Sequence, residues 1–166
     1  MARRKTTDRD LSEFEKRLET QETRLTEIEK GVEKHLDAFK RLEESLQDLR
    51  GQMEGVASDD VRMAINEVAE AQGDVVRELE AAEEERNELL EENDEMQKQV
   101  QEAHKQRAAS LQKLTLTVMA MPEGSAKGRA SAASDSIQRD MNKLGLLDAQ
   151  LKEVAGKLKA LNVNPR

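Results

Sequence analysis

Residues 58–121 decide the fold of this chain, and they read SDDVRMAINEVAEAQGDVVRELEAAEEERNELLEENDEMQKQVQEAHKQRAASLQKLTLTVMAM. Seam positions follow one another at alternating spacings of four and three residues, beginning with Val61, Ile65 and Val68. This alternation is the heptad pattern by which one face of a helix packs against a partner in a coiled coil. The stretch therefore predicts one long helix over about residues 59–121.

A second heptad pattern precedes this stretch and predicts a helix over about residues 8–50. Its seam positions are Leu11, Phe14, Leu18, Gln21, Leu25, Ile28, Val32, His35, Phe39, Leu42, Leu46, Leu49, Met53 and Val56. The two patterns are out of phase, and the break holds Gly51 and Gly55, which suit a helix end and a turn. Ser58 or Asp59 then suits the cap of the next helix. We expect a turn here, with the chain doubling back.

Folding the first helix onto the second gives an antiparallel hairpin, with the turn centred between the two glycines. The seam residues then pair in layers, and two of these layers match polar residues with polar residues: Gln21 with Arg86 and His35 with Gln72. Beside the seam, Arg17 would face Glu92. The alternative is a parallel dimer of the first helix, but parallel pairing of the second would oppose Glu78 and Glu83 of two copies. We favour the hairpin.

A third amphipathic helix is predicted over about residues 135–161. Residues 122–134 are small and polar and are expected to be a flexible linker, and residues 1–7 a basic flexible arm. The expected domains are thus the arm, a hairpin over 8–121, the linker and a C-terminal helix over 135–162. The apolar stripe of that helix is a candidate face for docking a partner protein. It comprises Leu144, Leu147, Leu151, Val154, Leu158 and Leu161.

Composition supports an all-α, elongated coiled coil. Charged residues make up 37 % of the 166 residues and aromatic residues 1 %, with Phe14 and Phe39 the two rings. Compact globules of this size usually bury several rings, because rings carry large apolar areas. No apolar run approaches the roughly 18 residues that span a bilayer. We expect a soluble, cytoplasmic protein without a membrane partner.

Charge is unevenly distributed along the chain, whose net charge is −8. Residues 77–95 hold ten acidic residues against Arg77 and Arg86, whereas the chain from Lys127 onward holds eight basic residues against four acidic ones. Such asymmetry can set the direction in which copies assemble, or bind unlike partners at the two ends. A solvated helix face is the simpler interpretation.

No residue pattern predicts catalysis, a cofactor site or a metal site. His35 and His104 are the two histidines and no cysteine is present, whereas a zinc site needs three or four ligands. Carboxylates are numerous, but the helical pattern puts them on exposed faces and not in a cleft that would shift their pKa values. We therefore do not expect an enzyme.

Polar residues on the seams are the candidate specificity residues. A buried Asn at such a position costs stability and fixes helix register or oligomer state. We assign this role to Asn93, Gln21, His35 and Arg86. The apolar stripe of the second helix is also widened by Val76, Leu90, Leu111 and Val118, more than one partner helix covers. We therefore expect a homo-oligomer.

The function that we expect is that of a scaffold or spacer assembled through helix–helix contacts. One alternative is an adaptor that docks its C-terminal helix on a partner protein. Another is a nucleic-acid- or polymerase-associated coiled coil, because Ser58-Asp59-Asp60 resembles the acidic tip that some coiled-coil factors insert into a polymerase channel. The sequence has no aromatic platform for base stacking, and we do not expect nucleic acid as a partner.

Overall fold

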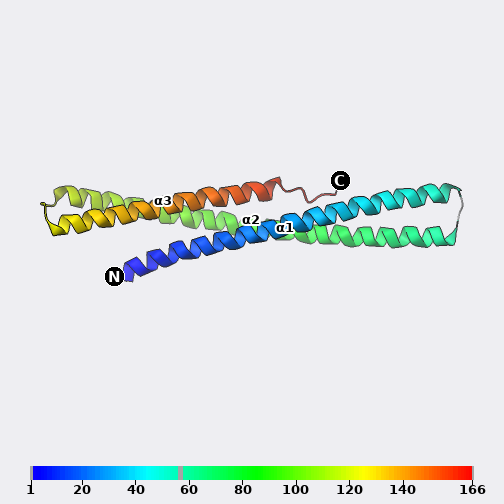
Figure 1. Cartoon of the computed structure of the whole chain (residues 1–166), viewed down its shortest axis with the longest axis horizontal. Helices are drawn as coiled ribbons and strands as arrows, with labels where there is room; N and C mark the ends of the chain where they lie inside the picture. The colour runs from blue at the N-terminus through cyan, green and yellow to red at the C-terminus, as the bar shows by residue number, and fades with distance from the viewer. Residues whose placement is uncertain (1, 56–57, 166) are drawn as a thin grey trace. The chain divides into compact units, whose positions relative to one another are not determined.

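The computed structural model describes residues 2–55 and 58–165, with side chains described from Asp10 onward. It contains three helices, α1 (Ala2–Gly55), α2 (Asp59–Ala120) and α3 (Ser125–Ala160), and these residues include no strand (Figure 1). The predicted all-α fold, a helical hairpin followed by a third helix, is confirmed. No helix within the described residues is both long enough and apolar enough to cross a membrane.

The chain divides into two compact units, and the long helices contribute to both. Unit 1 combines α1 up to Glu22 with Leu90–Lys159, which is the second half of α2 and nearly all of α3. Unit 2 combines Thr23–Leu89 with the segment that begins at Ala160. Unit 1 is therefore built from three helices, and unit 2 from two helices and a C-terminal tail.

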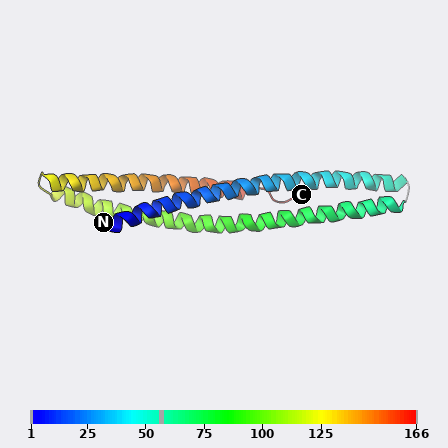
Figure 2. The same cartoon turned by 60° about the horizontal axis from the view of Figure 1, so that its bottom comes forward.

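The core of unit 1 is fully buried where its three helices meet. Helix α3 turns back after α2 and lies beside it, as both views show (Figures 1 and 2). Met96 and Val100 of α2 have no exposed surface, and neither do Leu144, Leu151 and Leu158 of α3. With three helices around one seam, a side chain is covered on every side, which explains this complete burial.

Unit 2 is buried less evenly. The side chains of Leu25, Ile28 and Val32 in α1 and of Leu79 in α2 are buried. Nearer the α1–α2 turn most of the seam is only half-buried, because two helices leave the sides of their shared seam open. The half-buried seam residues there are Leu42, Leu49, Met53, Val61, Ile65 and Val68.

The start of α2 follows the predicted capping chemistry. The hydroxyl Oγ of Ser58 accepts a hydrogen bond from the backbone N–H of Val61 at 3.3 Å. Asp59 and Asp60 lie in the first turn, where carboxylates interact favourably with the positive end of the helix dipole. Val56, expected to close the seam of the first helix, lies outside the described residues.

Two predicted boundaries are wrong. Helix α1 begins at Ala2, so the arm expected over residues 1–7 is helical from that residue on. The linker expected over 122–134 is helical from Ser125. Four of its ten residues from Ser125 to Ser134 are alanines, the strongest helix formers. At its other end α3 stops at Ala160, one residue from the predicted end, and Leu161 begins a tail without regular secondary structure.

Gly31, in the interior of α1, gives a test of the helical assignment. A Cβ added at this position would meet no atom within 4 Å, so Gly31→Ala removes backbone freedom from the unfolded chain without a clash. We expect the free energy of unfolding to rise by about 0.5–1 kcal/mol. Urea unfolding followed by circular dichroism measures this change. The matched control Ala81→Gly, at an exposed position of α2, should lower stability by a similar amount. A destabilised Gly31→Ala variant would contradict the helix at this position.

Candidate functional site

Asn93 of α2 lies at the centre of a polar layer in unit 1. Its side chain has no exposed surface. Its amide nitrogen Nδ2 donates one hydrogen bond to Oε1 of Gln21 in α1 at 2.9 Å and another to the backbone carbonyl of Leu151 in α3 at 3.0 Å. Both amide hydrogens are therefore used. One side chain joins all three helices of the unit.

The remaining polar atoms of this layer are also bonded. Gln97 donates from Nε2 to Oδ1 of Asn93 at 2.6 Å, and Gln21 donates from Nε2 to the sulfur of Met96 at 3.6 Å. A buried polar network is stable when every member has a partner, and costly when one is missing. Sliding one helix along another would leave these groups unpaired. The layer therefore favours a single register, and the role of Asn93 and Gln21 in fixing that register stays a prediction.

The register itself differs from the predicted one by seven residues. Gln21 bonds to Asn93 and not to Arg86, and Arg17 donates from Nη1 to Oε1 of Gln99 at 2.9 Å, where Glu92 was expected. The physical cause is that α1 continues through Gly51 to Gly55 before the chain turns. A shift of one whole heptad keeps apolar residues on the seam, so the apolar pattern alone does not distinguish the two registers.

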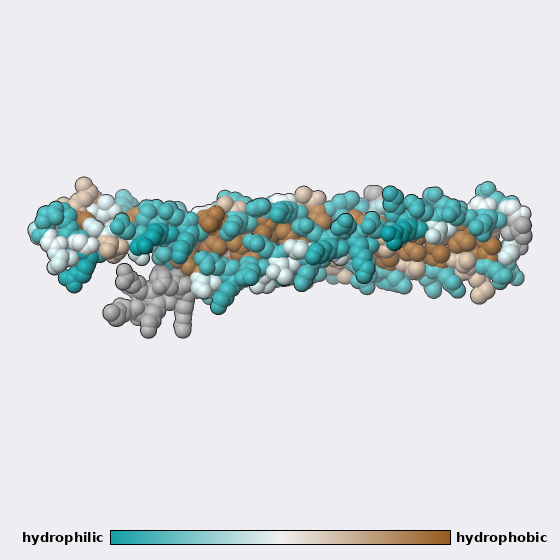
Figure 3. Space-filling model, viewed as in Figure 1, coloured by the Kyte–Doolittle hydropathy of each residue, from teal (hydrophilic) through white to brown (hydrophobic). Residues whose placement is uncertain are grey.

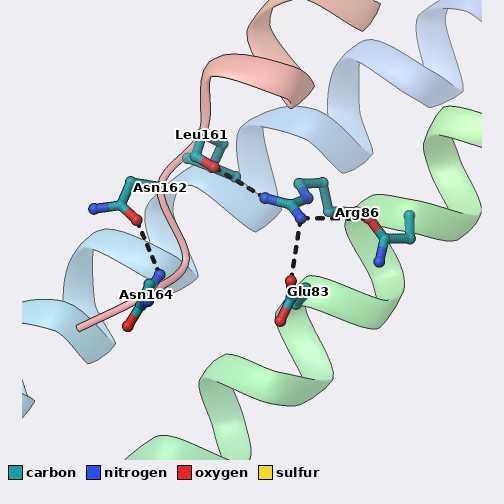
Figure 4. A network of polar contacts seen from close by, with 6 residues as sticks. Glu83, Arg86, Leu161, Asn162 and Asn164 are labelled. Carbon is teal, nitrogen blue, oxygen red and sulfur yellow. Dashed lines mark hydrogen bonds and ion pairs between the residues drawn. The ribbon is translucent and has the colours of Figure 1, made fainter. Parts of the chain in front are cut away.

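Arg86 has a different role from the predicted one. It belongs to unit 2, where its guanidinium nitrogen Nη1 donates to the backbone carbonyl of Leu161 at 3.0 Å (Figure 4). Its other terminal nitrogen, Nη2, lies 3.4 Å from Oε1 of Glu83 and 3.4 Å from Oδ1 of Asn87. Arg86 thus holds the C-terminal tail against α2 and does not form a layer with Gln21.

The tail forms one wall of a groove on unit 2. Val163 is buried, with 7 % of its surface exposed. The groove has a volume of about 610 Å³, and its lining includes Phe39 of α1, Val76 and Leu79 of α2, and the tail itself. Val76 is one of the residues that widen the apolar stripe of α2. The tail is therefore a cover for part of that stripe, which the sequence pattern did not reveal.

The apolar stripe of α3, which was predicted to dock a partner protein, is buried within the chain itself. All of its members in α3 are buried, with exposed fractions between 0 % and 4 %. They are Leu144, Leu147, Leu151, Val154 and Leu158. Leu161 lies beyond the end of α3, in the half-buried tail. While α3 stays folded in unit 1, this face is not available to another protein.

A second polar pair joins α2 to α3 in unit 1. Arg107 is buried, its Nε lies 3.9 Å from Oδ2 of Asp140, and its Nη1 donates to the carbonyl of Ala103 at 3.3 Å. Nε and Nη2 of Arg107 have no hydrogen-bond partner. Both residues occupy seam positions in the heptad patterns of their helices. Opposite charges on two seams were the signal that could have predicted this pair.

The two histidines lie in different units. His35 is half-buried on α1 in unit 2. His104 lines a small hollow of about 180 Å³ in unit 1 with Val100, Leu144 and Asp148. Among residues 10–55 and 58–165, no group of three or more histidine, aspartate and glutamate side chains could hold a metal ion. Two side chains of these types, those of His104 and Asp148, line the hollow.

Comparison with known proteins gave no relative for this chain. No protein-family model, curated protein or solved structure matched it.

Replacing Asn93 should test the polar layer. Asn93→Ala leaves the carbonyl of Leu151 and the carboxamide of Gln21 without their donor, so we expect a loss of about 2–4 kcal/mol in the free energy of unfolding in urea. The matched control Asn87→Ala changes the same residue type at an exposed position of α2 and should cost less than about 1 kcal/mol. Equal losses in the two variants would contradict a special role for Asn93.

The register of α1 against α2 can be measured by crosslinking pairs of introduced cysteines, because the chain has no cysteine of its own. Cysteines at positions 17 and 99 should be joined by a short bifunctional maleimide, since Arg17 and Gln99 are in contact. A pair at positions 17 and 92 should react more slowly.

The double variant Asn93→Leu, Gln21→Leu should retain its stability but lose the preference for crosslinking 17 to 99 over 17 to 92, because an apolar layer tolerates more than one register.

Substitution in the tail tests the groove of unit 2. Val163→Asp puts a charge where an apolar side chain is buried, so we expect the tail to detach and trypsin to cleave after Lys159 about tenfold faster. Asn162→Asp is the matched control, because it adds the same charge at an exposed position of the same tail. Cleavage followed by mass spectrometry gives both rates. The bound tail is ruled out if Val163→Asp is cleaved at the wild-type rate.

Proposed function

We propose that this protein is a non-enzymatic scaffold that assembles with copies of itself through helix–helix packing. The observation that supports this most directly is the half-buried seam of unit 2. Leu42, Ile65 and Val68 would be covered in a three-helix or four-helix arrangement, as the seam of unit 1 is. Apolar surface left open along a helical pair is a typical site for further helices.

The surface of unit 2 supports the same proposal. Apolar residues form a brown band between teal charged residues over the hairpin of α1 and α2 (Figure 3). The tail covers the part of this hairpin around Phe39, Val76 and Leu79. The seam nearer the turn is lined by residues that keep part of their surface exposed, among them Val61 and Ile65. A further helix packed there would remove this area from water.

The buried polar layer supports a defined assembly and not a loose one. Asn93 and its partners fix how the three helices of unit 1 are aligned. A scaffold needs such a fixed alignment, because its function is to hold contacts at constant spacing. The alternative of an adaptor that docks α3 on a partner loses support, since the docking stripe is buried within the chain.

Sedimentation equilibrium over a range of concentrations tests the proposal. We expect a mass that is a multiple of the 18.7 kDa monomer. Ile65→Gln should weaken association by about tenfold, because it removes an apolar contact from the interface. Asn66→Gln, at the neighbouring exposed position, should not. Circular dichroism checks that both variants remain helical. A monomer at every concentration would overturn the proposed function.

A further inference from the structure

Two exposed apolar side chains lie near the end of α2, in unit 1. Leu116 and Met119 are 64 % and 76 % exposed. They are three residues apart, so they share one face of the helix, and Lys113 lies three residues before Leu116. Lys113 is exposed as well. We call this surface, Lys113, Leu116 and Met119, together with Arg129 of α3 at the same level along the helices, the basic tip.

Arg129 belongs to the basic tip because of how α3 runs back along α2. Arg107 pairs with Asp140, and Val100 lies beside Leu144. Continuing this antiparallel register toward the turn puts Arg129 at the level of Leu116. Arg129 is exposed. Residues 105–134 contain five basic residues and one acidic residue, Glu123, which pairs with Lys127 at 3.0 Å.

A surface of the opposite charge lies on unit 2 near the α1–α2 turn. Met63 of α2 is 61 % exposed. Glu67 and Glu70 follow it at spacings of four and three residues, on the same face of the helix, and both are exposed. Residues 42–75 hold nine acidic residues against Arg50 and Arg62. We call the surface formed by Met63, Glu67 and Glu70 the acidic hairpin face.

We propose that the basic tip of one copy docks on the acidic hairpin face of a second copy. This inference rests on the proposed function and names the two surfaces that meet. Each surface presents an exposed apolar centre with charges beside it, and the two sets of charges are opposite. Contact buries Leu116, Met119 and Met63 together and places lysine and arginine beside glutamate. Every copy of the chain carries both the basic tip and the acidic hairpin face, so a second copy supplies the surface that each of them needs.

The proposed contact joins two different surfaces, so it is heterologous. Each copy then keeps one unused basic tip and one unused acidic hairpin face. A heterologous contact that does not close into a ring adds copies in one direction. Because exposed charges contribute, association should weaken as salt screens them; the screening length falls from roughly 10 Å at 0.1 M to about 3 Å at 1 M.

Two charge-reversal variants of the full chain test this contact. The tip variant carries Lys113→Glu and Arg129→Glu, and the hairpin variant carries Glu67→Lys and Glu70→Lys. All four residues are exposed, so both variants should fold, which circular dichroism verifies. Each variant alone should associate at least about tenfold more weakly than the wild type. The tip variant still has a wild-type hairpin face, and the hairpin variant a wild-type tip.

Mixing the two variants gives the decisive result. An equimolar mixture should recover the association of the wild type, measured by sedimentation velocity, because the two remaining wild-type surfaces are complementary in charge and the two reversed surfaces are complementary as well. A control variant carries both Lys98→Glu and Arg77→Glu, at exposed positions outside the two surfaces. It should assemble as the wild type does.

The failures of the two proposals are distinguishable. If both charge-reversal variants assemble as the wild type does, the scaffold function stands and the tip-to-hairpin contact is overturned. If the wild type is a monomer at all concentrations, both are overturned. Retention of double-stranded DNA by a monomeric wild type, lost in the tip variant, would assign the basic tip to nucleic acid and also overturn the contact between copies.

Discussion

The carboxamide of Asn93 is the interaction on which the arrangement of unit 1 depends. It is wholly buried, and its two hydrogens bond to a side chain of α1 and to the backbone of α3. Apolar layers above and below it supply most of the stabilisation, but Leu, Val and Met side chains can pack in several alignments. The hydrogen bonds of Asn93, by contrast, form in only one alignment of the helices. The layer therefore turns a generally favourable packing of helices into one defined arrangement.

The two units show how the number of helices around a seam controls burial. In unit 1 the third helix completes the cover, and Met96 and Val100 lose all contact with solvent. In unit 2 a tail takes the place of the third helix around Phe39 and Val76, and the seam beyond it stays half-buried. The sequence pattern is nearly the same in both. The difference arises from the length of α3, which ends at Ala160.

Heptad spacing was sufficient to predict the three helices and the hairpin, and it placed Asn93 and Gln21 on the seam. It was not sufficient for the pairing, because a slip of one heptad leaves every seam residue on the seam. The two glycines misplaced the turn, since Gly51 and Gly55 are tolerated within α1. The start of α3 was missed because Ser, Ala and Gly residues are common in linkers, although alanines also favour helix. The tail is held by the burial of Val163 and by the hydrogen bond from Arg86 to Leu161, and helix periodicity signals neither contact.

The order of synthesis adds a consequence to the three-helix bonding of Asn93. Gln21 has already left the ribosome's catalytic centre when Asn93 is added, but Leu151 follows 58 residues later. At about 5–20 residues per second, this delay is roughly 3–12 s. Until Leu151 has been added and α3 has folded back, the amide of Asn93 lacks its acceptor on α3, and the apolar residues that α3 buries lack their cover. Apolar surface that is transiently exposed on a nascent chain favours association. Neighbouring ribosomes on one messenger RNA would hold several such surfaces close together.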